Sequence, residues 1–432
     1  MKTRIQHFSR PQQGSALIIT MVMALAASLI LMSFFGLLKS RSLVRARAMT
    51  WNSAMPLAEA GIEEALTHFT DDINSPAANG WTLIPMVSNG IPQQVVWRQR
   101  TFPDGSYYQV WLFNANLNID SNNPNIYSTG YMPAPLGKGG YLTRSIRLTG
   151  TNPPLVSFAI AAVSTVQMNG NGWLTDSFNS SNPNLSNNGQ YDPNRTSTNG
   201  NVGSVNGPVN FGNHSIKGSL YLGPGATNNS SVTSLQVSGG IYDDFNVYFP
   251  DVRLPITTWN SISTTTVQGK SVYDFTNSGD YYVSDSTPII VEPGVQVRVR
   301  VDTTTFNPSG ISILSSGGNS GTLQLYQVSG SADLSGGLSV NSGRARNFYY
   351  YGLPGVTSIK YGGNSAFIGV MYAPEADLTL TGGGNNNVDL IGASITKTVT
   401  MNGHFSFHFD EDLLTAGPGR GFVMTSWNEV GG

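Results

Sequence analysis

The chain contains no cysteine among its 432 residues, which excludes a disulfide framework and any cysteine-based metal site. Charged residues make up only 11% of the chain and form no basic face, so a nucleic-acid partner is not expected. The charges are also unevenly distributed. Residues 1–58 hold seven of the 23 basic residues and no acid, which leaves 16 basic against all 25 acidic residues in the rest.

An uncharged apolar run over residues 15–38 follows a basic leader, residues 1–14. At about 1.5 Å per residue the run forms a helix of about 36 Å, long enough to cross a bilayer. In an ordinary secretory signal the cleavage site follows the apolar core. Here the candidate cleavage point, between Gly14 and Ser15, precedes it, so cleavage would leave the helix on the mature protein. An uncleaved signal anchor is the alternative.

Residues 39–70 continue as a predicted amphipathic helix, because apolar residues recur near a spacing of 3.6. Pro56 is expected to kink this helix rather than end it. Within it lies the segment Leu-Ala-Glu-Ala-Gly-Ile-Glu-Glu-Ala-Leu, which starts at Leu57. Its distinctive residues are Glu59, Gly61, Glu63 and Glu64.

The apolar run behind Gly14 and the Ala-Glu-Ala-Gly segment together resemble the N-terminus of type IV prepilins and pseudopilins, in particular of PilX-type minor pilins. The resemblance covers roughly the first 70 residues. It implies cleavage by prepilin peptidase, a single-pass inner-membrane anchor with an exported C-terminus, and assembly with other pilin subunits in a pilus or pseudopilus. Ile19 stands where major pilins carry Glu, which indicates a minor or priming subunit rather than the bulk fibre subunit.

Residues 71–150 predict a small antiparallel β unit like a pilin head. Alternating runs at 92–102 and 106–113 flank a Pro-Asp-Gly turn and predict a hairpin. The whole chain is therefore expected to be α+β.

Residues 151–413 are rich in Asn, Gly, Ser and Thr, yet short β-branched and aromatic runs recur between turn clusters. This pattern favours a large right-handed β-helix-like solenoid over disorder, with a β-sandwich as the alternative. A weak repeat places Gly369 over Gly392, an offset of one plausible coil. An insertion is expected near 241–288, and residues 414–432 are predicted to be a flexible tail.

The pattern from Tyr372-Ala-Pro to the run that begins at Asn402-Gly-His-Phe also resembles a domain of unknown function that is often joined to PilX-like N-termini. That resemblance covers roughly residues 155–413 and implies no activity.

His404 and His408 precede three acidic residues, 410–412, in the chain's one cluster of His and carboxylates. Strand positions four apart lie about 13 Å from each other, too far to share one metal ion. We expect the neighbouring Phe side chains to enter the core and the acidic residues to cap the end of the solenoid. No metal, cofactor or catalytic residue is predicted.

Other polar clusters have ordinary structural explanations. Asp243, Asp244 and Asp251 could bind calcium, but they lack the dense spacing of a calcium loop and are interpreted as solvated turn carboxylates. Arg298 and Arg300, like Arg344 and Arg346, alternate with other residues as half-buried strands require.

Tyr350 and Tyr351 are candidate contacts for a surface glycan. The sequence therefore favours a non-enzymatic, minor-pilin-like subunit that displays a solenoid head for assembly or surface contact. A membrane-anchored adhesin or carbohydrate-binding protein is the first alternative, and a polysaccharide-active enzyme is the second.

Overall fold

A computed structural model of the chain describes residues 13–71, 80–88, 91–113, 125–135, 139–151, 153–169, 174–224, 226, 235–363, 365–382, 388–416 and 423–431. Residues 1–12 of the predicted leader, 1–14, lie outside the described residues. The chain forms two compact units. The stem unit combines the N-terminal helix, a sheet and the C-terminal strand, and the coil domain spans residues 152–423. A long helix followed by a large β-rich region confirms the α+β class.

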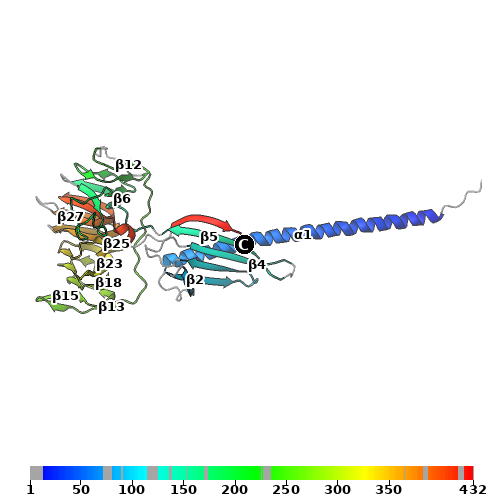
Figure 1. Ribbon diagram of the computed structural model, residues 1–432, viewed down its shortest axis with the longest axis horizontal. Coiled ribbons are helices and arrows are strands. Elements are labelled where there is room, and N and C mark those ends of the chain that lie inside the picture. Colours follow the sequence, from blue (N-terminus) through cyan, green and yellow to red (C-terminus); the bar gives the residue numbers. More distant parts are fainter. Residues whose placement is uncertain are drawn as a thin grey trace, which may run out of the picture. The chain divides into compact units, whose positions relative to one another are not determined.

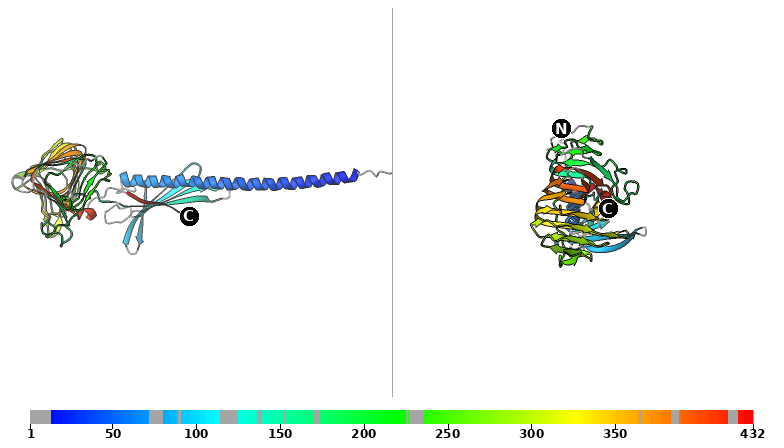
Figure 2. Two further views of the ribbon diagram at one scale, coloured as in Figure 1. Left: turned by 90° about the horizontal axis from the view of Figure 1, so that it is seen from above. Right: turned by 90° about the vertical axis from the view of Figure 1, so that its left-hand side faces the viewer.

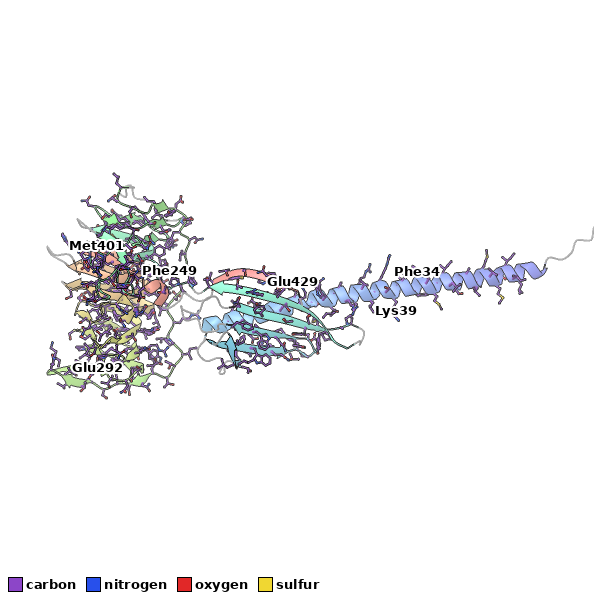
Figure 3. The ribbon with its side chains drawn as sticks, viewed as in Figure 1. Phe34, Lys39, Phe249, Glu292, Met401 and Glu429 are labelled. Carbon is purple, nitrogen blue, oxygen red and sulfur yellow. The ribbon has the colours of Figure 1, made fainter. Side chains whose placement is uncertain are left out.

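The stem unit is built on one helix, α1 (Gln13–Asp71), which continues through Pro56. The large apolar side chains between Leu17 and Leu38 are 44–75% exposed. Phe34 and Lys39 stand off this part of the helix in Figure 3. By length and composition, the segment Ala16–Thr67 could cross a membrane.

A six-stranded sheet packs against the C-terminal half of α1. Its order is β1 (Thr82–Ser88), β2 (Ile91–Thr101), β3 (Tyr107–Phe113), β4 (Asn125–Pro133), β5 (Tyr141–Thr151) and β29 (Val423–Val430). The predicted hairpin is confirmed as the antiparallel pair β2–β3.

The prediction of a flexible tail over 414–432 is wrong for β29, because this strand pairs with β5 at the edge of the stem sheet. Arg144 on β5 donates two hydrogen bonds to the Glu429 carboxylate, at 2.7 and 2.6 Å. The C-terminal strand thus returns to a sheet that the chain left at residue 151, and the coil domain is an insertion between β5 and β29.

The coil domain consists of strands, most of which stack in parallel (Figure 1). They are β6 (Ile160–Asn169), β7 (Leu174–Phe178), β8 (Val202–Ser204), β9 (Val209–Asn210), β10 (Ser215–Ile216), β11 (Leu220–Leu222), β12 (Ile241–Tyr242), β13 (Asn260–Ser261), β14 (Thr265–Val267), β15 (Lys270–Phe275), β16 (Gly279–Val283), β17 (Ile289–Val291), β18 (Gln296–Val301), β19 (Thr305–Phe306), β20 (Ile311–Ile313), β21 (Ser315–Ser316), β22 (Asn319–Ser320), β23 (Thr322–Asp333), β24 (Leu338–Val340), β25 (Phe348–Gly363), β26 (Phe367–Gly382), β27 (Val388–Gly403) and β28 (Phe405–Asp410), with the short helices η1 (Ala345–Asn347) and α2 (Leu413–Ala416).

The predicted repeat is confirmed, because Gly369 on β26 pairs with Gly392 on β27 in a parallel register. Both glycines have positive φ, and a Cβ on Gly392 would lie 2.0 Å from the carbonyl oxygen of Gly369. Glycine is therefore required where successive coils turn a corner. The β-sandwich alternative is wrong, because sandwich sheets are antiparallel whereas these coils pair in parallel.

The order of the coils does not follow the sequence. The chain enters the stack at β6, which lies between β27 and β8. The next strands of the stack, β8, β11 and β12, follow β6 toward one end, and the strand after them in sequence, β13, lies at the other end. From there the chain returns through β16, β18, β23, β25 and β26 to β27, which pairs with β6. The right-hand view of Figure 2 shows the strands of the stack from the side.

Residues 243–259, which we call the strap, carry the chain from one end of the stack to the other. Phe245 and Phe249 are buried, the Tyr372 hydroxyl donates to the Pro250 carbonyl at 2.8 Å, and Thr257 donates to Asp280 at 2.7 Å. The expected insertion near 241–288 is therefore too long, because residues 260–288 belong to the stacked coils.

Three faces surround the core of the coil domain. The strap face contains β8, β11 and the first halves of β25 and β26, and it lies under the strap. The closure face contains β15, β17, β20, β24, β28, β7 and β10. The threonine face contains residues 331–333, 358–363, 377–382, 398–403 and 165–169, which pair side by side in that order.

Candidate functional site

The two ends of the coil domain meet on the closure face. Strand β28, from the end of the domain, pairs in parallel with β27 on one side and with β7, from its beginning, on the other. Phe405, Phe407 and Phe409 point into the core and are at most 1% exposed. This confirms the prediction that the aromatic residues of this segment enter the core. His408, which lies between Phe407 and Phe409 in the strand, points to the opposite side and contacts Asp176 of β7.

His408 lies between two carboxylates and beneath a tyrosine ring. Its Nδ1 lies 2.5 Å from Oδ1 of the fully buried Asp176, and its Nε2 lies 3.3 Å from Oδ1 of the half-exposed Asp389. The Tyr191 hydroxyl donates to Asp176 at 3.1 Å, and the Tyr191 ring stacks on the imidazole at a centroid distance of 3.6 Å. His408 is only 3% exposed, so this arrangement gives no substrate access to the imidazole.

The environment of His408 favours its protonated form. Burial alone would lower the pKa of His408, but the hydrogen bonds to Asp176 and Asp389 outweigh it and raise the pKa above its usual value. The nearby His214 behaves in the opposite way, because burial lowers its pKa to about 3. Its Nε2 lies 2.6 Å from the Thr175 hydroxyl, which suits a neutral imidazole. The closure face thus holds one histidine whose pKa is raised and one whose pKa is lowered.

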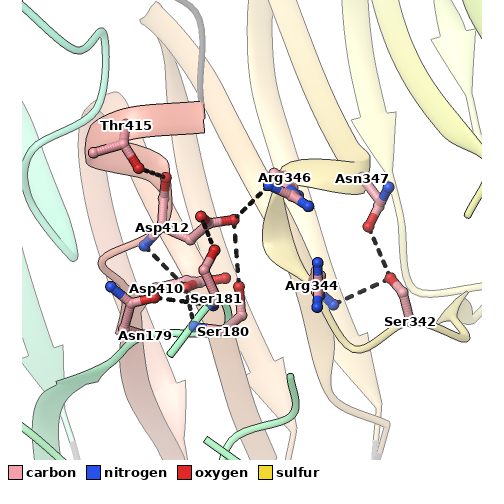
Figure 4. A network of polar contacts seen from close by, with 10 residues as sticks. All are labelled: Asn179, Ser180, Ser181, Ser342, Arg344, Arg346, Asn347, Asp410, Asp412 and Thr415. Carbon is pink, nitrogen blue, oxygen red and sulfur yellow. Dashed lines mark hydrogen bonds and ion pairs between the residues drawn. The ribbon is translucent and has the colours of Figure 1, made fainter. Parts of the chain in front are cut away.

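The acidic run after His408 binds residues 177–181, near the start of the coil domain, and Arg346, next to η1 (Figure 4). Asp410 accepts a hydrogen bond from the Ser180 backbone N–H at 2.9 Å. Asp412 accepts from the Ser181 hydroxyl and forms an ion pair with Arg346 at 3.1 Å. Between them, Glu411 accepts from Ser177 at 2.7 Å. Burial raises the pKa of Asp410, whose carboxyl group is fully enclosed.

These contacts fasten the C-terminal end of the coil domain to its N-terminal end across more than 200 residues of sequence. The prediction that the acidic residues cap the end of the stack is wrong, because β28 has a paired strand on both sides. We call residues Asp176, Tyr191, His408, Asp410 and Asp412 the closure cluster. Sequence reasoning missed Asp176, which only the register of β7 with β28 brings to His408, and Tyr191, which reaches the imidazole from the loop between β7 and β8.

The Ala-Glu-Ala-Gly segment lies in the part of α1 that packs against the stem sheet. Ala54, Ala58 and Ala65 are fully buried, and a Cβ on Gly61 would lie 2.2 Å from the Ser128 Oγ on β4. On the facing strand, a Cβ on Gly130 would lie 2.1 Å from the Ala54 carbonyl oxygen. Helix and sheet approach so closely that only small residues fit between them.

Glu64 of the segment binds the sheet directly through ion pairs and a hydrogen bond. Its carboxylate lies 3.2 Å from Arg98 Nε and 2.9 Å from Arg100 Nη2, and it accepts a hydrogen bond from the Tyr108 hydroxyl. Burial, and next the bond to Glu64, raise the pKa of Tyr108. Glu59 and Glu63 are exposed. Gly14 and Ser15 lie in the first turn of α1, and cleavage between them stays a prediction.

The proposed glycan contact at Tyr350 and Tyr351 is wrong. Tyr350 is fully buried and donates to Gln327 at 2.7 Å, and Tyr351 is 6% exposed and stacks on Tyr326 at 4.8 Å. Neither ring can stack on a sugar from solution.

Several of the remaining polar candidates lie apart from the closure cluster. Asp243, Asp244 and Asp251 are exposed on the strap. Arg298 binds Asp280 through two hydrogen bonds of 2.6 Å, and Arg300 binds Asp302 at 2.7 Å. Of the four arginines singled out in the sequence, Arg346 reaches the cluster.

A family described as "Domain of unknown function (DUF7305)" matches residues 258–416. Among solved structures, the chain is similar to the competence-associated pilin ComZ from Thermus thermophilus, with 10% identity over 88% of this chain and 98% of that chain. The TM-score is 0.22, at which the likeness supports no conclusion on fold or function. No curated protein matches the chain.

Proposed function

We propose that this chain is a non-enzymatic, minor-pilin-like subunit of the PilX type that holds the coil domain outside the inner membrane. The observation that carries the proposal is the division of α1 into two halves. Residues 17–38 present exposed apolar side chains all around the helix, as a membrane span or a helix bundle requires. Residues 54–65 instead pack through small side chains on an antiparallel sheet.

Assembly with other pilin subunits follows from the same division. An apolar helix that leaves the membrane needs neighbouring apolar helices to cover it. Ile19 provides no carboxylate to pair with a neighbour inside the apolar layer, which fits an accessory position better than a bulk one. We further propose that the coil domain is a right-handed β-helix, the handedness that parallel crossovers almost always adopt.

Processing by prepilin peptidase is tested by intact mass spectrometry. The full chain is expressed in a host with prepilin peptidase and in the same host without it, and membranes are extracted in each case. The account predicts loss of residues 1–14 only when the peptidase is present. The variant Gly14→Val is expected to keep its full mass in both hosts, and Gly36→Val, within the apolar run, is the control that should still be processed. An unchanged mass in the presence of the peptidase would contradict the proposal.

A further inference from the structure

Among the residues that the structure describes, segments of the chain cross two faces of the coil domain, and none crosses the third. The strap crosses the strap face, and residues around Tyr191 lie over part of the closure face. On the threonine face, the side chains that point outward are exposed or half-exposed. The alternate side chains, such as Leu378, Leu380 and Val399, are at most 1% exposed and fill the core. The open face is therefore a well-ordered sheet surface backed by a packed interior.

The outward residues of this face form two columns of hydroxyl and amide groups. Thr379, Thr400 and Gln167 lie side by side on three successive coils, and Thr381, Asn402 and Asn169 form the next column. The strands place these groups about 4.8 Å apart across the coils and about 6.6 Å apart along each strand. Within the parts of the chain that the structure describes, the hydroxyls of Thr379, Thr381 and Thr400 take part in no side-chain hydrogen bond, so they are available to a ligand.

The composition of the face selects the partner. The two columns contain no aromatic or large apolar side chain, which protein interfaces and membrane-binding surfaces require. The one cation among the outward positions, Lys360, lies 3.3 Å from Asp333, so an anionic polymer finds no free positive charge there. Asp377, farther along, accepts a hydrogen bond from Thr398 at 2.7 Å. What remains in the two columns is an uncharged, regularly spaced set of hydroxyls and amides. Among the amides, Gln167 donates to Asn169 at 2.7 Å and Asn169 donates to Asn402 at 3.1 Å, and their other donors and acceptors point outward with the hydroxyls.

We propose that the threonine face binds a neutral polysaccharide chain or bundle. Such a polymer matches the two columns in charge, because both are uncharged, and in chemistry, because its hydroxyls both donate and accept hydrogen bonds. Each contact with one coil is weak, and the repetition of the same contact over successive coils supplies the affinity. The binding does not depend on whether α1 is cleaved or assembled, so it can succeed or fail separately from the proposed function.

The test is a pull-down of the purified full chain in a zwitterionic detergent that contains no sugar. The probes are microcrystalline cellulose, chitin and insoluble β-1,3-glucan. The account predicts that at least one probe retains the chain. Replacement of Thr379 and Thr400 by Arg should then lower the bound fraction at least tenfold, because two bulky charges interrupt the column. Replacement of both by Val keeps the shape, removes only the hydroxyls, and should lower binding several-fold.

The matched control is Ser312→Arg, which places the same bulky charge at an outward position of β20 on the closure face. This variant should bind like the unmodified chain. Thermal unfolding of each variant checks that it is folded. If the variant with Arg at positions 379 and 400 does not fold, the variant with Val at both positions provides the test. The proposal is overturned if none of the three probes retains the chain, if both Thr pairs bind unchanged, or if Ser312→Arg loses as much binding as the Thr379 and Thr400 pair.

Discussion

Strands β28 and β29 are near neighbours in sequence, and each closes one unit of the molecule, but they do so in opposite ways. All six residues of β28 are buried, and the strand has a partner on both sides. Six of the eight residues of β29 are exposed, and the strand lies at the edge of the stem sheet. The coil domain therefore depends on its returning strand for its core, whereas the stem unit gains only an extra edge. Substitutions that disturb the contacts of β28 should therefore lower the free energy of unfolding far more than substitutions that disturb the contacts of β29.

The largest effect is expected from Asp176→Ala, which removes the buried partner of His408 and Tyr191. Breaking a buried ion pair typically costs about 3–5 kcal/mol, because the remaining charge loses its compensation. The free energy of unfolding of the coil domain, measured by chemical denaturation, should fall by about this amount. The control is Asp389→Ala, at the half-exposed carboxylate on the other side of the imidazole, with an expected loss below about 1 kcal/mol. Equal losses in the two variants would contradict the special role of the buried side.

The next largest effect concerns the stem unit alone. Gly130→Ala places a methyl group against the Ala54 carbonyl and should destabilise the packing of α1 on the sheet by about 1–3 kcal/mol. Hydrogen exchange of residues 54–65 should increase, while exchange in the coil domain stays the same. Gly36→Ala is the control, because a Cβ there meets nothing within 4 Å. A matching increase in the coil domain would show that the two units are not separate.

A smaller, pH-dependent effect should appear in the coil domain. Because the pKa of His408 is raised in the folded state, its contribution is complete below the ordinary histidine pKa of about 6.5 and is lost as pH rises through the folded-state value. One proton limits the slope to about 1.4 kcal/mol per pH unit. Denaturation of the coil domain at pH 6 to 9 should show this loss.

In His408→Gln this loss of stability with rising pH should be removed. His214 acts in the opposite direction, because its folded-state pKa is lowered to about 3 while its unfolded-state imidazole titrates near 6.5, so its contribution rises with pH at the lower end of the range. The raised pKa of Asp410 acts in the same direction as that of His408, and because His408→Gln keeps Asp410, the difference between the two proteins isolates the contribution of His408. A slope of the same size in His408→Gln would assign the titration to another group.

The smallest effect is expected from Arg144→Ala, which removes the two bonds to Glu429 and the contact of the guanidinium with Trp51, 4.1 Å from the ring centroid. Hydrogen exchange should rise in residues 423–430 and stay unchanged in β3 and β4. Protection lost from the whole stem sheet would mean that β29 is more than an edge strand.

Local patterns in the sequence predicted the parts of the fold that are local. The apolar run and the 3.6 spacing predicted α1, the Pro-Asp-Gly turn predicted the β2–β3 hairpin, and the repeat predicted the register of Gly369 with Gly392. The closure of the coil domain could not be predicted in this way. His408 and Asp176 are 232 residues apart, and nothing near either residue specifies the other. The return of β29 to the stem sheet was missed for the same reason.

The stacking order of the coil domain is the central claim of this account, and engineered disulfides test it directly because the chain has no cysteine of its own. Thr400, Gln167 and Asn210 lie side by side on β27, β6 and β9. Cysteines on adjacent strands lie about 4.8 Å apart and can bridge, whereas two strands away, at about 9.6 Å, they cannot.

The measurement is the mass of each purified double variant after mild oxidation, with and without reductant. The account predicts a disulfide in the variant that combines Thr400→Cys with Gln167→Cys, and none in the variant that combines Thr400→Cys with Asn210→Cys. The absence of a bridge between positions 400 and 167, or a bridge between 400 and 210, would show that the chain does not enter the stack between β27 and β8.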